Sequence, residues 1–255
     1  MLSARRLHLS WCVIIWCVEV SIIISINTLS KVHQMRATRI AISGFSSGVG
    51  KTTLMCDLLS RFRGWEAIKI SRGHYRSCGK DPQACCISPL LGEEPRVVSG
   101  RFSTFSPQKD TGRFWTAGAG NVHWVICTND QVERGVNQAL DQVKADGVFI
   151  EGTSFLKYFP VDYSLMVVNP STGEIKSSAV GVIKKINAFY VGDSVIGRVR
   201  FDEIRSRLQK RGVDVEEIPV FYECDLAALS EHISNIHGRR TTPLAPSAGR
   251  HVDTL

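Results

Sequence analysis

The sequence predicts an α/β fold, with a mostly parallel β-sheet and helices on both of its faces. Short apolar runs alternate with amphipathic segments along the chain, which is the pattern of consecutive βαβ units. The first apolar run, at residues 38–43, ends at a glycine-rich turn that leads directly into an amphipathic segment. A composition of 44% hydrophobic and 22% charged residues indicates a globular domain with some additional segments.

Strands and helices alternate in the first part of the chain. Short apolar runs predict strands at 38–43, 66–70, 121–127 and 147–150. Helices are expected at 52–62, 110–117 and 132–143. Two apolar helix faces follow from residues three and four apart, namely Met55, Leu58, Leu59 and Phe62, then Val132, Val136, Leu140 and Val143.

The same alternation continues towards the C-terminus. Strands are expected at 163–168, 188–191 and 215–221, and helices at 178–187, 200–211 and 225–236. Strands that alternate with helices in this way form parallel βαβ units, with the helices packed on both faces of one sheet.

The chain divides into four parts. Residues 1–34 are an apolar N-terminal extension, and residues 35–200 form the main domain. This domain contains a cysteine-bearing insertion at 71–109, which is rich in Gly, Pro and Ser and has weak periodicity; a connection of that length is usually functional or disordered. Residues 201–238 are expected to form an α/β C-terminal extension, and the polar, proline-containing residues 239–255 a disordered tail.

The N-terminal extension has more than one interpretation. Residues 9–29 are mostly apolar and reach the length of about 20 residues that a membrane anchor needs. Glu19 near their centre would cost roughly 2–3 kcal/mol in a bilayer. The alternative is a true start at Met35, which opens directly onto the first strand. No small-residue cleavage site follows, so a secretory signal fits poorly. A membrane partner is expected only if 9–29 is an anchor.

The distribution of charge and of cysteines argues against a nucleic-acid-binding protein and against a disulfide-stabilised secreted protein. The net charge of +7 is spread along the chain, and no run of Lys and Arg alternates with aromatic residues, so nucleic acid is not an expected partner. Cys56, Cys127 and Cys224 lie in apolar surroundings and are expected to be buried free thiols. A disulfide scaffold is not expected in such a chain, and the cytoplasm is the predicted location.

The glycine-rich turn carries the strongest motif. It reads Gly44-Phe-Ser-Ser-Gly-Val-Gly-Lys-Thr-Thr53, between a predicted strand and a predicted helix, which is the context of a phosphate-binding loop (P-loop). Glycines let backbone N–H groups converge on phosphate oxygens, and the helix N-terminus adds partial positive charge. Lys51 would reach the β and γ phosphates, and the Thr52 hydroxyl would coordinate Mg²⁺. The nucleotide-binding residues of the loop are Gly44, Ser46, Ser47, Gly48, Val49, Gly50, Lys51, Thr52 and Thr53.

Two residues that follow predicted strands are candidate ligand-binding residues beside this loop. Glu151 ends the apolar strand 147–150 and is followed by glycine, so we expect it to hold Mg²⁺ together with Thr52. Lys176 follows the strand 163–168, and the carboxyl edge of a parallel sheet is where ligands bind. For Lys176 a ligand contact and a solvated loop lysine both stay open.

Three cysteines in the insertion suggest a weaker alternative. Cys78, Cys85 and Cys86 lie near His74, and thiolates with an imidazole can bind zinc or an iron–sulfur cluster. Adjacent cysteines do not easily ligate one metal, and the spacing departs from paired Cys-x-x-Cys. A loop with free thiols is the other interpretation.

Together these segments resemble the molybdopterin-guanine dinucleotide biosynthesis protein B family, a branch of the dimerising P-loop GTPases. The resemblance covers roughly residues 37–200. It rests on the P-loop, on Ile68-Lys69-Ile70 with His74, on Lys109-Asp110-Thr111 with Arg113 and Ala117-Gly118-Ala119, and on Ile150-Glu151-Gly152. The resemblance implies a three-layer P-loop NTPase fold.

The resemblance also implies a function. It points to a GTP-binding accessory protein of molybdenum-cofactor biosynthesis, with slow GTP hydrolysis, Mg²⁺ as cofactor, a homodimer and a guanylyltransferase partner. Lys69 and His74 would border the nucleotide or cofactor site, and Lys51, Asp110 and Glu151 would carry the chemistry. A helix N-cap is the other interpretation of Asp110.

Other features favour different functions. Five residues separate Gly44 from Gly50, where the common loop has four, and this spacing resembles dethiobiotin synthetase. No Asn-Lys-x-Asp guanine-reading motif is present, so ATP stays open as the nucleotide. The alternatives are an ATP-dependent carboxylate-activating ligase and a metal chaperone switched by nucleotide.

Overall fold

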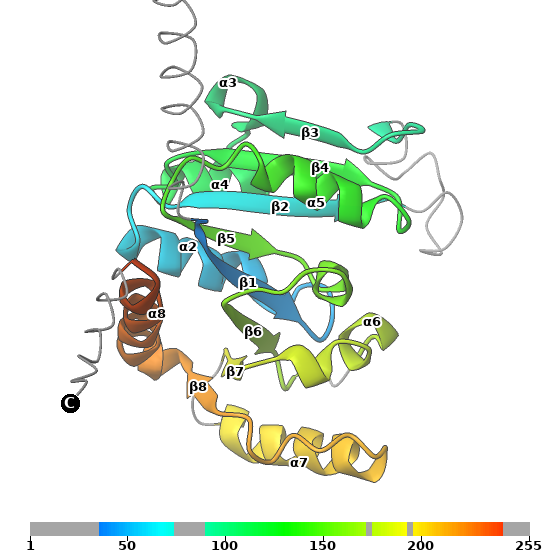
Figure 1. Ribbon diagram of the computed structural model, residues 1–255. Coiled ribbons are helices and arrows are strands. Elements are labelled where there is room, and N and C mark those ends of the chain that lie inside the picture. Colours follow the sequence, from blue (N-terminus) through cyan, green and yellow to red (C-terminus); the bar gives the residue numbers. More distant parts are fainter. Residues whose placement is uncertain (1–35, 74–89, 172–174, 193–195, 242–255) are drawn as a thin grey trace, which may run out of the picture. The chain divides into compact units, whose positions relative to one another are not determined.

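The structure is a computed structural model that describes residues 36–73, 90–171, 175–192 and 196–241 (Figure 1). Residues from Ala37 onward belong to one compact unit. None of the helices in these ranges is long and apolar enough to cross a membrane. Residues 9–29, considered above as an anchor, lie outside the described ranges.

One eight-stranded sheet organises the unit, in the order β3-β4-β2-β5-β1-β6-β7-β8. Every pairing is parallel except that of β3 with β4, which is antiparallel. Figure 1 shows β3 at one end of the sheet and β8 at the other, with β1 near the middle. The strands are β1 (Thr38–Gly44), β2 (Glu66–Arg72), β3 (Arg96–Ser99), β4 (Val122–Cys127), β5 (Gly147–Glu151), β6 (Tyr163–Val168), β7 (Ala188–Val191) and β8 (Val220–Tyr222).

Helices cover both faces of the sheet, which confirms the predicted three-layer α/β class. One face packs against α2 (Lys51–Arg61), α4 (Asp110–Thr116) and α8 (Leu226–Thr241). The other packs against α5 (Val132–Leu140), α6 (Ser177–Val180) and α7 (Ile196–Lys210). The short helices are α3 (Arg101–Thr104) and the 3₁₀ turns η3 (Ser154–Lys157), η4 (Ile183–Lys185) and η5 (Glu223–Asp225).

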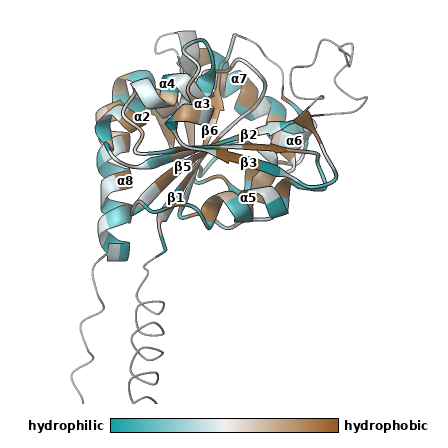
Figure 2. Cartoon of the chain, turned by 90° about the horizontal axis from the view of Figure 1, so that it is seen from above, coloured by the Kyte–Doolittle hydropathy of each residue, from teal (hydrophilic) through white to brown (hydrophobic). Residues whose placement is uncertain are grey.

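Alternation along the strands builds the two cores. In β1, Ile40 and Ile42 belong to the cluster with α2, whereas Ala41 belongs to the cluster with α5, because successive side chains of a strand point to opposite faces. The hydropathy colouring shows apolar strands enclosed by helices of mixed colour (Figure 2). Such a sheet is buried on both faces, which explains why its strands are nearly continuous apolar runs.

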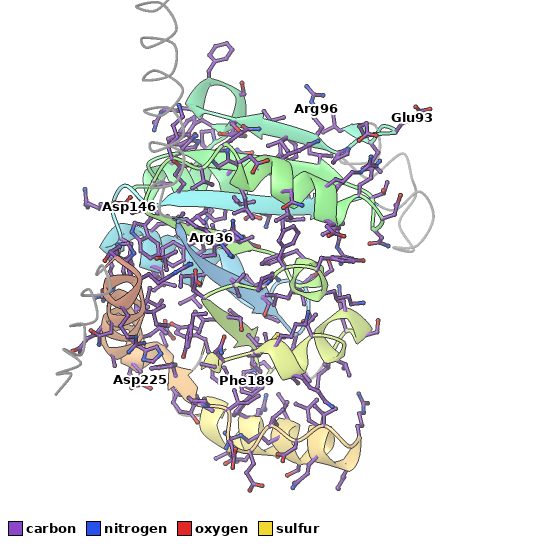
Figure 3. All side chains as sticks on the ribbon, in the orientation of Figure 1. Arg36, Glu93, Arg96, Asp146, Phe189 and Asp225 are labelled. Atoms are coloured by element: carbon purple, nitrogen blue, oxygen red, sulfur yellow. The ribbon has the colours of Figure 1, made fainter. Side chains whose placement is uncertain are left out.

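The C-terminal region completes this sheet. β8 pairs in parallel with β7, and the ring centroids of Phe201 on α7 and Phe189 on β7 lie 5.1 Å apart. Phe189 lies between its strand and α7 (Figure 3). Within 201–238, the region predicted as an α/β extension, several apolar residues, including Ile204 and Leu208, are buried in the core of the sheet domain.

Several predicted elements need correction. The insertion 71–109 contains β3 and α3; the Val97-Val98 pair of β3 was too short a run to be recognised, and pairing with β4 supplies its stability. The helix predicted at 178–187 is α6 followed by η4, with the break at Gly181. The strand predicted at 215–221 begins only at Val220. α8 continues to Thr241, so the first residues of the predicted tail are helical, and 242–255 lie outside the described ranges.

The three described cysteines differ in exposure. Cys127 is buried and Cys56 is partly buried, and burial raises the pKa of both thiols to about 11. Cys224 is exposed, contrary to expectation, because it lies in the 3₁₀ turn between β8 and α8.

Candidate functional site

The glycine-rich loop joins the end of β1 to the start of α2. Gly48 and Gly50 have φ angles of 73° and 99°, which residues with side chains rarely adopt. At Gly44 a Cβ atom would lie 2.7 Å from the Val49 side chain and 3.1 Å from that of Lys51, so the close turn also excludes a side chain there. The Lys51 ammonium donates to the carbonyl of Ser46 at 3.1 Å. The loop therefore curls around its own lysine, as a phosphate-binding loop does.

A cavity of about 680 Å³ opens above this loop. Its floor is the loop and the first turn of α2, and its walls are the ends of β2 and β5 together with α4 and residues near α6. The lining residues are Gly44, Ser46, Ser47, Gly48, Gly50, Lys51, Thr52, Thr53, Lys69, Ile70, Arg72, Asp110, Arg113, Glu151, Gly152, Thr153, Ser154, Lys176 and Ser178. We refer to it as the phosphate cavity.

Three residues from distant parts of the sequence meet in the phosphate cavity. Lys69 and Glu151 are register partners on the adjacent parallel strands β2 and β5. The Lys69 ammonium lies 2.6 Å from Glu151 Oε1 and 2.7 Å from Asp110 Oδ2. Asp110 is the first residue of α4, whose N-cap is Lys109 and has no side-chain cap hydrogen bond. The Asp110 carboxylate thus contacts Lys69 and the Thr52 side chain and does not cap α4.

Glu151 also contacts the loop directly. The Thr52 hydroxyl donates to Glu151 Oε2 at 3.2 Å, and Glu151 is only 2% exposed. A carboxylate and a hydroxyl at this separation are hard oxygen donors of the kind that Mg²⁺ prefers. In the described ranges no group of three or more His, Cys, Asp or Glu residues is placed to hold a metal ion.

The charges of the cavity perturb one another. Burial alone would lower the pKa of Lys69, but the carboxylates of Glu151 and Asp110 outweigh it and hold that pKa above its usual value. Burial raises the pKa of Asp110, but its hydrogen bond and charge interaction with Lys69 prevail and hold it below its usual value. The pKa of Lys51 is lowered, chiefly by burial. An anionic ligand would offset that cost by giving Lys51 a counter-charge.

Most of the residues selected from the sequence lie in this one cavity. Val49 is an exception among the loop residues, because its side chain is buried in the core against α2. Lys176 lines the cavity and donates to Ser47 Oγ of the loop at 2.9 Å. His74, Cys78, Cys85 and Cys86 lie outside the described residues.

Four lining residues were not anticipated, namely Arg72, Thr153, Ser154 and Ser178. The amide of Gly44 donates to Thr153 Oγ1 at 3.2 Å, which ties the loop to the end of β5. Arg72 is the last residue of β2. Arg72 could have been predicted as a lining residue from its place at the carboxyl end of a parallel strand next to β5, because the carboxyl ends of parallel strands lie at one edge of the sheet.

Comparisons with known proteins give distant structural likenesses. No known family profile matches the sequence, and no curated protein is significantly similar to it. HypB from Helicobacter pylori in complex with nickel is 11% identical with a TM-score of 0.49, over 86% of this chain and 96% of HypB. LpxK from Aquifex aeolicus in complex with ATP is 14% identical with a TM-score of 0.39, over 79% of this chain and 77% of LpxK. The Zn(II)-bound YjiA GTPase from E. coli is 14% identical with a TM-score of 0.36, over 68% of this chain and 54% of YjiA.

The fold assignment rests on the chain itself. A glycine-rich loop between β1 and α2, in the middle of a mostly parallel sheet with helices on both faces, is the architecture of P-loop NTPases. The lysine and threonine at the start of α2 and the acidic residue at the end of the neighbouring β5 occupy the positions expected for this fold.

Proposed function

We propose that the chain binds a nucleoside triphosphate with Mg²⁺ and hydrolyses it slowly, as a GTP-binding accessory protein of molybdopterin-guanine dinucleotide biosynthesis. The supporting observation is the contact of Lys69 with both Asp110 and Glu151 beside the P-loop. These are the residues that the family resemblance selected, and they come from three separate segments of the sequence. A cytoplasmic homodimer is part of the proposal.

The loop would hold the phosphates. Backbone N–H groups of residues 46–52, at the N-terminus of α2, are suited to bind β- and γ-phosphate oxygens. Lys51 and Lys176 lie on two sides of the loop and would add positive charge. A hydrogen bond from a charged ammonium to a phosphate oxygen is stronger than one between neutral groups.

Thr52 and Glu151 would hold Mg²⁺. Their oxygens are close enough to share one ion, with phosphate oxygens and water completing its shell. When bound, Mg²⁺ neutralises charge on the β and γ phosphates. The Lys69 ammonium lies 2.6 Å from the other oxygen of Glu151 and would hold that carboxylate in position beside the ion.

Asp110 would orient the attacking water. Its carboxylate lies in the cavity opposite the loop lysine and is kept ionised by Lys69. A carboxylate with a lowered pKa is a weak base, so it positions water better than it removes a proton. Slow turnover follows from this chemistry and suits an accessory protein.

The first test compares GTP with ATP in the presence of Mg²⁺, using the full chain and Lys51→Ala as a control. The proposal expects tighter binding of GTP, slow release of inorganic phosphate, a dimer in light scattering, and binding to a molybdenum-cofactor guanylyltransferase. An ATP preference without guanylyltransferase binding would overturn it. In that case the next experiment is ATP-dependent phosphorylation of small carboxylic acids.

A further inference from the structure

A second cavity of about 370 Å³ adjoins the phosphate cavity, and the proposed function does not use it. The two share Lys69 and Asp110, whose ion pair forms part of the wall between them. The remaining lining residues are Ser71, Ser103, Thr104, Phe105, Ser106, Lys109, Thr111 and Trp124. We refer to this as the side cavity. Its volume is within the range of small-molecule sites.

Two aromatic side chains line the side cavity, and both have polar partners that fix them. The indole N–H of Trp124 donates to Ser71 Oγ at 2.9 Å. The guanidinium of Arg101 lies over the ring of Phe105, 4.6 Å from its centroid. Phe105 is 39% exposed, so part of its ring is accessible to a ligand. Aromatic walls of this kind favour a flat ring.

The outer wall of the side cavity is held in place. Thr104 accepts a hydrogen bond from the Trp115 indole at 2.8 Å and donates to the carbonyl of Gly100 at 2.7 Å. The backbone of Ser106 packs so closely on Gly112 of α4 that a Cβ atom at Gly112 would lie 1.8 Å from the Ser106 carbonyl oxygen. The cavity is therefore preformed, which lowers the entropic cost of filling it.

The charges of the side cavity favour an anion. Asp110, the acidic residue of the lining, is already paired with Lys69. Lys109 lines the cavity and has no ion pair within the described part of the chain. Its ammonium is thus a ready partner for a carboxylate or phosphate group.

From these contacts we infer that the side cavity binds a second ligand, a small planar aromatic anion whose ring lies between Phe105 and Trp124 and whose charge faces Lys109. The inference deepens the proposed function, because such a ligand would contact the Lys69–Asp110 pair that also borders the phosphates. Nucleotide and ligand would then affect each other's binding through this shared wall.

The experiment measures binding of 2-naphthoate to the full chain by calorimetry, next to naphthalene-2-carboxamide and cyclohexanecarboxylate. The first comparison removes the charge and the second removes the planar ring. We expect 2-naphthoate to bind most tightly. Phe105→Ala should weaken its binding by about tenfold, the factor for one lost aromatic contact of roughly 1.4 kcal/mol. Lys109→Ala should remove the preference for the acid over the amide.

Phe102→Ala is the matched control, since Phe102 lies three residues away and is fully exposed without lining either cavity. It should leave 2-naphthoate affinity unchanged. Equal affinity in Phe105→Ala and the unmodified chain, or equal binding of the aliphatic and aromatic acids, would overturn the inference. Lys51→Ala separates the two proposals, because it should lose nucleotide and keep 2-naphthoate. If the unmodified chain binds 2-naphthoate but neither nucleotide, the side cavity stands and the proposed function fails.

Discussion

Lys69 and Glu151 face each other across two adjacent parallel strands, with 2.6 Å between the ammonium and a carboxylate oxygen. The Glu151 side chain is 3% exposed and that of Lys69 is 17% exposed. Water can therefore solvate either charge only poorly if the other is removed. Asp110 adds a second carboxylate to the same ammonium. Lys69 therefore balances two acidic groups at the edge of the phosphate cavity.

Replacing Lys69 with methionine should destabilise the protein. The variant keeps the length of the side chain but leaves Glu151 and Asp110 close together without their cation. We expect the free energy of unfolding in urea to fall by about 3–5 kcal/mol, as when one partner of a buried ion pair is removed. Lys210→Met, at the exposed end of α7, is the control and should change stability little. If the Lys69→Met chain is as stable as the control, the ion pair makes no net contribution to the free energy of unfolding.

Lys51→Ala should abolish triphosphate binding while the fold is retained. Among the described residues, the Lys51 ammonium donates to the Ser46 carbonyl, and burial lowers its pKa, so replacing it should cost the ligand-free protein little stability. Calorimetry with GTP and ATP measures the binding, and circular dichroism checks the fold. Unchanged affinity would remove the loop from the nucleotide site.

Glu151→Gln should spare triphosphate binding and reduce turnover. The amide keeps an oxygen near Thr52 but loses the charge that would hold Mg²⁺. We expect phosphate release to slow by about 100-fold or more, comparable with the loss of one group that stabilises transition-state charge. The Mg²⁺ concentration needed for half-maximal turnover should rise as well. Glu93→Gln, an exposed acid, provides the control.

The position of the loop between β1 and α2, and that of Glu151 at the end of β5, could be predicted from the sequence because each is a local pattern. The glycines, the lysine and the following helix are contiguous, and Glu151 ends a clear apolar run. The contact of Lys69 with Asp110 depends on the position of α4 over β2, which no local pattern encodes. The family resemblance placed both residues at the border of the site but did not predict that they pair. The side cavity was missed because its outer wall lies in 71–109, where periodicity is weak.

The pairing of Glu66 with His123 should make stability depend on acid pH. His123 Nε2 lies 2.6 Å from Glu66 Oε2, and the amides of Lys144 and Ala145 donate to Oε1. Burial raises the pKa of Glu66, but these hydrogen bonds outweigh burial and hold that pKa below its ordinary value. The contribution to stability is therefore complete above the ordinary pKa of glutamate and is lost as the pH falls through the lowered one.

Glu66→Gln tests this relation. The amide still accepts from the two backbone N–H groups but carries no charge. At pH 7 we expect a loss of about 1.5–3 kcal/mol in the free energy of unfolding, the value of hydrogen bonds to a charged group. The difference from the unmodified chain should shrink as the pH is lowered below the ordinary glutamate pKa. Glu217→Gln on the surface should show neither effect. A constant difference across this range would contradict the assignment.

Gly112→Ala should have two opposing effects on stability, because alanine favours the helix but its side chain would clash at the wall of the side cavity. Gly112 lies within α4, where alanine is favoured over glycine by about 1 kcal/mol. Its new Cβ atom, however, would lie 1.8 Å from the carbonyl oxygen and 2.4 Å from the carbonyl carbon of Ser106. Because the obstacle is backbone, the segment before α4 must move, and overpacking of this kind costs about 1–3 kcal/mol. We expect a net loss of stability and weaker 2-naphthoate binding, with thermal melts and calorimetry as the measurements. Gly238→Ala, in α8, should be neutral or stabilising, because no described atom outside the adjoining helix backbone lies within 4 Å of the added Cβ. If Gly112→Ala is stabilising as well, the segment around Ser106 moves at little cost, and the side cavity is not preformed.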